Sequence, residues 1–228
     1  MLQGMSFRTL LTTVMAVGFL AEAASGHAAP PATERPGSVR VAVALAPPVP
    51  DSPRQIRAMM EEAEAIWRPY DVRLTWPAPG IGGSTERPDV RLQVKFVHPA
   101  PSGQPLETSG RPSLGTIQFF EGDRPDDTIL LLANEITRRV LSAGIYGPPA
   151  VVDDVIGRAT GRVLAHEIGH YLLALRAHTR GGLMRSSFGG QELVALDRHA
   201  LRLDEGALLR LRARLADVTF VARAQARN

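Results

Sequence analysis

Three histidines, one glutamate and a methionine lie within twenty positions, in the stretch AHEIGHYLLALRAHTRGGLM at residues 165 to 184. Residues four apart share one face of a helix, so His166 and His170 can direct their imidazole nitrogens at one point. Glu167 is about 100° further around the helix, where its carboxylate can reach a water on a metal without being a ligand itself. This HExxH spacing predicts a zinc ion that activates a water, with Glu167 accepting the proton.

The segment around the motif has the pattern of a largely buried helix. Apolar residues recur there at helical spacing, at Ile156, Val163, Leu164, Ile168, Leu172 and Leu175. We expect this helix to begin near Asp153 or Asp154. The alternative interpretation is a pair of hydrogen-bonded core histidines beside a surface glutamate. It is weaker, because HExxH seldom arises by chance in a chain with six histidines.

A tetrahedral zinc site needs a third protein ligand in addition to two histidines and a water. The chain has no cysteine, so that ligand must be a histidine or a carboxylate. His178 comes eight residues after His170, which is about 12 Å along the axis of a continued helix and too far for the same ion. The chain must therefore break and turn back near residues 175–177 if His178 is to bind. Gly181 and Gly182 supply turn-permissive backbone just after it.

The HExxH motif, the histidine that follows it and the GLM turn at residues 182–184 resemble the metzincin branch of the zinc peptidases. The order of strands and helix before the motif is similar to the upper subdomain of that family. The resemblance spans residues 39–185, and its specific part is the last twenty. It implies a zinc ion held by His166, His170 and His178.

The same resemblance implies roles for three further features. Glu167 would be the general base, and Met184 would be the methionine of the turn beneath the metal. Residues 114–120 (LGTIQFF) would form the edge strand on which a peptide substrate lies antiparallel.

Two positions depart from the metzincin pattern. Metzincins place the third histidine six residues after the second, where this chain has Arg176. They also have a glycine three residues after the second histidine, where this chain has Leu173. We therefore expect the helix to run two residues longer and to turn without that glycine.

Glu192 competes with His178 as the third ligand. It lies in GQELVALD, which resembles the gluzincin arrangement in which a second helix supplies a glutamate some twenty residues after the motif. Asp197 follows at a spacing suitable for a hydrogen bond to a ligand. From sequence, the choice between His178 and Glu192 stays open.

The remaining patterns predict an α+β fold. We expect a mixed twisted sheet packed on the active-site helix, as in zincins, followed by a small helical C-terminal subdomain. The strands are expected at residues 38–46, 71–76, 89–97, 114–120 and 127–133, with helices at 51–70, 134–141 and 204–216.

The N-terminus predicts export. Residues 1–29 contain Arg8, an apolar run of about a dozen residues and then small residues, as in a signal peptide that is removed. An uncleaved anchor is the alternative. Residues 30–37 are a Pro-rich linker, and residues 38–228 are expected to form one domain that lacks a membrane span and is periplasmic or secreted.

The sequence therefore predicts an exported zinc-dependent endopeptidase that acts on a peptide or protein substrate. The alternative is a non-catalytic metal-binding or interaction module on a peptidase-like fold, and a third possibility is an envelope protein anchored by its N-terminal segment. Nucleic acid is not an expected partner, because the basic residues are scattered among acidic ones and the net charge is only +3.

Overall fold

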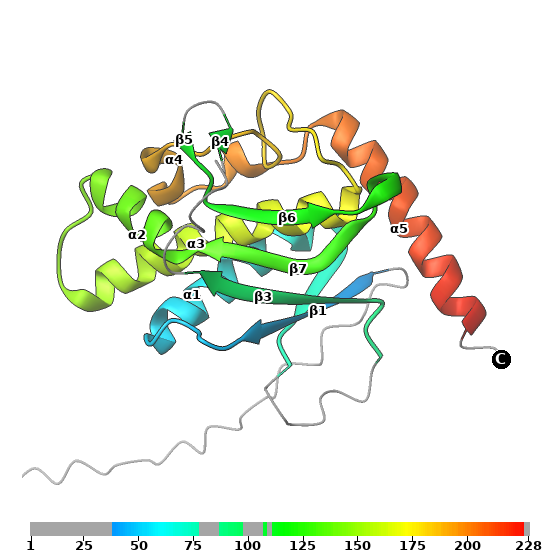
Figure 1. Ribbon diagram of the computed structural model, residues 1–228, viewed down its shortest axis with the longest axis horizontal. Coiled ribbons are helices and arrows are strands. Elements are labelled where there is room, and N and C mark those ends of the chain that lie inside the picture. The colour runs from blue at the N-terminus through cyan, green and yellow to red at the C-terminus, as the bar shows by residue number, and fades with distance from the viewer. Residues whose placement is uncertain (1–37, 78–86, 98–106, 109–110, 226–228) are drawn as a thin grey trace, which may run out of the picture. The chain divides into compact units, whose positions relative to one another are not determined.

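A five-stranded mixed sheet supports the helix that carries the histidines (Figure 1). The computed structural model describes residues 38–77, 87–97, 107–108 and 111–225. The first four strands in the sheet order are mutually parallel, and β6 pairs antiparallel with β7 at one edge. The order is β2 (Val72–Thr75), β1 (Val39–Ala46), β3 (Val90–Val97), β7 (Pro125–Leu132) and β6 (Gly115–Phe119). The predicted signal segment and linker, residues 1–37, lie outside the described residues.

The strands follow the alternation expected of a sheet with one buried face. Along β3, every second side chain is buried in the core and the ones between are exposed. The buried set is Val90, Leu92, Val94 and Phe96. One face of the sheet therefore packs on the helices.

Two helices, α1 (Pro53–Trp67) and α3 (Pro149–Leu173), pack against each other and against the sheet. The remaining helices are α2 (Ala133–Ser142), α4 (Gly190–Val194) and α5 (Glu205–Gln225). Short 3₁₀ turns are η1 (Arg68–Tyr70), η2 (Glu121–Asp123) and η3 (His199–Leu201), and a two-stranded ribbon is formed by β4 (Glu107–Thr108) and β5 (Arg111–Pro112). A mixed sheet packed on the histidine-bearing helix, with further helices after it, confirms the predicted fold class.

Helix α3 begins earlier than the predicted Asp153 or Asp154. It begins at Pro149, because proline at the first helical position has a suitable φ and needs no donor there. The Pro148 carbonyl accepts the first helical hydrogen bond, from the amide of Val152 at 3.2 Å. None of the described helices is long and apolar enough to cross a membrane.

Small residues every four positions along α3 let α1 approach closely. They are Gly157, Gly161, Ala165 and Gly169. A Cβ on Gly161 would lie 2.5 Å from the Met59 carbonyl oxygen, so the two backbones are almost in contact. The indole Nε1 of Trp67 donates to the Ala165 carbonyl at 3.1 Å. These contacts fix α3 against α1.

We expect Gly161→Ala to destabilise the fold by about 1–3 kcal/mol, because the added methyl meets backbone that cannot move aside cheaply. The free energy of unfolding of the metal-free protein in urea measures this. The matched control is Gly206→Ala on α5, where an added Cβ would be 3.6 Å from the nearest atom. Equal stability of the two variants would contradict the close packing of α1 on α3.

Candidate metal centre

The last turns of α3 present two imidazoles to one point. His166 donates its Nδ1–H to the Leu183 carbonyl at 2.7 Å, and His170 donates its Nδ1–H to the Leu175 carbonyl at 2.5 Å. A carbonyl oxygen only accepts, so both protons are assigned to Nδ1. The two Nε2 atoms, 3.0 Å apart, then face each other with their lone pairs.

Both imidazoles are neutral near pH 7. Burial, together with the charge repulsion of the neighbouring His170, lowers the pKa of His166 to about 3. Burial also lowers the pKa of His170 to about 4. Two neutral nitrogen lone pairs at 3.0 Å repel each other unless a cation lies between them. Unprotonated imidazole nitrogens are the ligands that zinc requires.

The third imidazole reaches the same point from the loop after α3. The ring of His178 stacks on His166 with centroids 5.3 Å apart and is nearly perpendicular to His170 at 4.9 Å. One nitrogen from each of the three rings lies within 4.8 Å of the others. Tetrahedral zinc with bonds of 2.0–2.1 Å separates its ligand nitrogens by about 3.3 Å, so small side-chain shifts bring the donor set to that geometry.

His178 arrives there by a route that differs from the prediction. The expected two-residue extension of the helix is wrong, because α3 ends at Leu173. Ala174 takes the left-handed conformation (φ 44°, ψ 53°), and the amide of Leu175 donates to the His170 carbonyl at 3.2 Å. The additional residues thus lie in the turn after the helix, and an alanine takes the conformation that glycine usually provides.

Glu167 lies beside the imidazoles and against the sheet edge. Its side chain is buried and touches Gly115 of β6, where an added Cβ would be 2.9 Å from the carboxylate Oε1. Burial raises the pKa of Glu167 to about 8. Among the described residues the carboxylate has no hydrogen-bond or ion-pair partner, which leaves it free to bind a water or a substrate group.

Met184 packs against Gly169, between the two motif histidines, and Phe188 contacts His166. Met184 is buried, and its sulfur lies against Gly169, where a Cβ would be 2.4 Å away. The amide of Thr179 donates to the Met184 carbonyl at 2.7 Å, which closes the turn. The Phe188 ring meets His166 edge-on at 5.5 Å. The methionine thus lies under the helix between the two motif histidines.

The structure places Glu192 and Asp197 outside the histidine cluster. Glu192 accepts the Gly189 amide at 2.7 Å as part of the N-terminal cap of α4, and its other oxygen pairs with Arg185. The Asp197 carboxylate accepts the amide of His199 at 3.0 Å. Of the two candidates for third ligand, only His178 lies beside His166 and His170.

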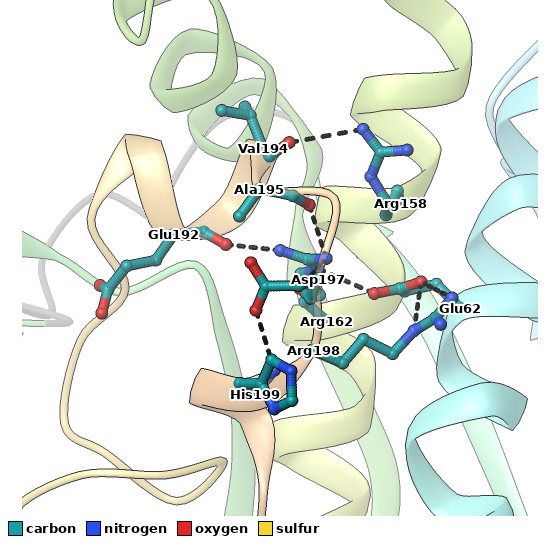
Figure 2. Close-up of polar contacts among 9 residues, drawn as sticks. All are labelled: Glu62, Arg158, Arg162, Glu192, Val194, Ala195, Asp197, Arg198 and His199. Atoms are coloured by element: carbon teal, nitrogen blue, oxygen red, sulfur yellow. Dashed lines mark hydrogen bonds and ion pairs between the residues drawn. The ribbon is translucent and has the colours of Figure 1, made fainter.

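One residue that sequence reasoning missed is Arg162, one turn before His166. It is almost fully buried and pairs with the buried carboxylate of Glu62 on α1 at 2.8 Å (Figure 2). Its other nitrogens donate to the carbonyls of Glu192, Ala195 and Asp197. Burial lowers the Arg162 pKa, and the ion pair with Glu62 opposes that shift. This side chain fixes the segment after α4 to α3.

Strand β6 lies at the sheet edge, as residues 114–120 were expected to do, and pairs only with β7 among the described strands. Its Gly115 touches Glu167, and the Phe119 ring lies edge-on to His170 at 6.4 Å. The unpaired edge of β6 therefore runs past the histidine cluster.

The chain resembles known proteins in structure and not detectably in sequence. No family model matches the chain, and no curated protein sequence matches it significantly. Among solved structures, the chain is similar to an archaemetzincin from Methanopyrus kandleri, with 15% sequence identity and a TM-score of 0.45. The likeness covers 81% of this chain and 99% of the archaemetzincin.

Proposed function

We propose that the protein is a zinc-dependent endopeptidase. The observation that carries this proposal is the convergence of three imidazoles, two of them buried and neutral, beside a buried carboxylate that has no partner among the described residues. His166, His170 and His178 would hold the metal. A zinc ion there would lower the pKa of a bound water and polarise a carbonyl oxygen.

Glu167 is the general base in this proposal. Its neighbours on both sides fix its position, since α3 carries it and Gly115 of β6 leaves room for its carboxylate. A zinc ion at the three imidazoles would favour the ionised form of Glu167 over the protonated form that burial favours. In that form Glu167 would accept the proton of the attacking water and pass it to the leaving amine. Phe119 and Phe188, whose rings contact the motif histidines, limit access of bulk water to the site.

The unpaired edge of β6 supports an extended peptide as the substrate. Such an edge offers backbone donors and acceptors at the spacing that a peptide strand needs. A peptide on this edge would pass close to the site, because Gly115 lies against Glu167 and the Phe119 ring lies against His170. We further propose that residues 1–29 direct export, so that the substrate is periplasmic or extracellular.

The second candidate function is a metal-binding module without turnover. Two features of His178 favour this second candidate. His178 lies two residues beyond the metzincin spacing, and its side chain is exposed. In that case zinc binds but peptides stay intact.

Metal removal tests the proposal. We expect the purified protein to bind one zinc ion per chain, to cleave members of a broad peptide library, to lose cleavage with a chelator and to regain it with zinc. Mass spectrometry of the digest gives the cleavage sites. Zinc binding without cleavage would establish the second candidate, and a protein that binds no zinc would overturn both.

A further inference from the structure

Arg210 of the C-terminal helix α5 donates hydrogen bonds to the end of the histidine-bearing helix. Arg210 donates its Nε–H to the Leu173 carbonyl at 2.5 Å and its Nη2–H to the Ala174 carbonyl at 2.8 Å. The last carbonyls of a helix have no partner within the helix and carry its negative dipole end. A guanidinium is suited to this place, because it is cationic and can donate to two oxygens at once.

The turn that Arg210 contacts also determines where two candidate ligands lie. Ala174 has a left-handed backbone, which is strained for a residue with a Cβ and therefore needs support from its surroundings. The next residue, Leu175, accepts the Nδ1–H of His170 through its carbonyl. The chain then reaches His178 within three residues, so a change in this turn displaces both rings.

The same C-terminal segment also holds the far end of the loop. The Arg202 carbonyl accepts the amide of Leu183 at 2.9 Å, and the Leu183 carbonyl accepts the Nδ1–H of His166. Gly182, with φ 73°, lies directly against that carbonyl, since a Cβ there would be 2.3 Å from the Arg202 oxygen. Residues 202–210 thus fix the loop of residues 174–184 at both ends.

We infer that Arg210 is a positioning residue of the metal centre, acting through the Leu173 and Ala174 carbonyls to hold His178 and the Leu175 carbonyl in place. This inference rests on the proposed metal site, and its test does not require peptidase activity. Mutation of a residue that hydrogen-bonds to a metal ligand typically weakens metal affinity by roughly 10–100-fold. Arg210 contacts the backbone of the turn and not a ligand side chain, so we expect a loss of zinc affinity of about tenfold.

The test compares Arg210→Ala with Arg212→Ala in the full chain. Arg212 is a second exposed arginine on α5, and it has no hydrogen-bond or ion-pair partner among the described residues. Zinc affinity is measured by competition with a chromogenic chelator, and the d–d absorption of the Co²⁺-loaded protein reports ligand geometry. We expect Arg210→Ala to bind zinc about tenfold more weakly with an altered Co²⁺ spectrum, and Arg212→Ala to match the unmodified protein.

Two additions separate positioning from general stability. Arg210→Lys keeps the positive charge but replaces the planar fork of guanidinium donors with a compact ammonium group, so its zinc affinity is expected to be intermediate. In a His178→Ala background, the loss caused by Arg210→Ala is expected to shrink, because the two residues act in series. Unchanged zinc affinity and Co²⁺ spectrum in Arg210→Ala, even with a lower melting temperature, would overturn the inference.

These outcomes are distinct from a failure of the proposed function. If the unmodified protein binds zinc and cleaves no peptide, the peptidase proposal fails and the role of Arg210 still stands on metal affinity. If it cleaves peptides and Arg210→Ala binds zinc as tightly as before, only the positioning role fails.

Discussion

Glu167→Gln is expected to keep zinc bound at full stoichiometry and to lower kcat/KM for peptide cleavage by roughly 10²–10⁴-fold. The amide has nearly the shape of the carboxylate and fits beside Gly115, but it cannot accept a proton from water. Zinc content by mass spectrometry and initial rates on one cleaved peptide measure the two effects separately. Full activity of the variant would remove Glu167 from the mechanism.

Glu192→Gln is the matched control for this experiment. It changes a carboxylate outside the histidine cluster. In the structure this carboxylate pairs with Arg185 and accepts the Gly189 amide. We expect it to retain zinc and most of the activity. Loss of zinc in Glu192→Gln with retention in His178→Ala would reverse the assignment of the third ligand.

Arg162→Leu is expected to destabilise the metal-free fold by about 3–5 kcal/mol, which is the usual cost of removing one partner of a buried ion pair. The change leaves Glu62 buried with only Arg198 opposite it (Figure 2). It also removes the donor to backbone carbonyls of α4 and of the segment after it. Urea unfolding followed by circular dichroism measures the loss.

The control for Arg162→Leu is Arg54→Leu, which breaks the exposed pair with Asp154. Surface pairs contribute at most about 1 kcal/mol, so this variant should be nearly as stable as the unmodified protein. The double variant Glu62→Gln/Arg162→Leu is expected to lose less than the sum of its single variants, because the unpaired charge is gone. Equal losses in Arg162→Leu and Arg54→Leu would contradict a stabilising role of the buried pair.

The sequence was sufficient where the structure depends on local periodicity. His166, Glu167 and His170 are placed by the helical repeat alone, and the alternation along β3 predicts which of its side chains are buried. The mixed sheet followed from the number and order of these elements. These features need no knowledge of contacts between distant segments.

The remaining features depend on long-range contacts that leave little local trace. The left-handed turn at Ala174 carries no glycine to mark it, so the end of α3 was predicted too late. Arg162 is surrounded by apolar residues in sequence, and its partner Glu62 is 100 positions away. An arginine on the buried side of an apolar helix was the available signal, since such a residue needs a paired acceptor.

The choice of third ligand depended partly on the local sequence and partly on long-range contacts. The sequence favoured His178 as the third ligand but left Glu192 as an alternative, because a histidine and a glutamate can each bind zinc. The capping contact of Glu192 with the Gly189 amide, together with its pairing to Arg185, engages that carboxylate elsewhere. The turn after α3 brings His178 to the other two rings instead.

The central claim is that one zinc ion is shared by three imidazoles, with the intervening glutamate beside it and not bound to it. An anomalous-difference map from crystals of the purified protein, collected at the zinc edge, tests this most directly. We predict one peak at about 2.0–2.1 Å from the Nε2 atoms of His166 and His170 and from a ring nitrogen of His178. No zinc peak at these rings, or a peak coordinated by Glu192 in place of His178, would contradict the account.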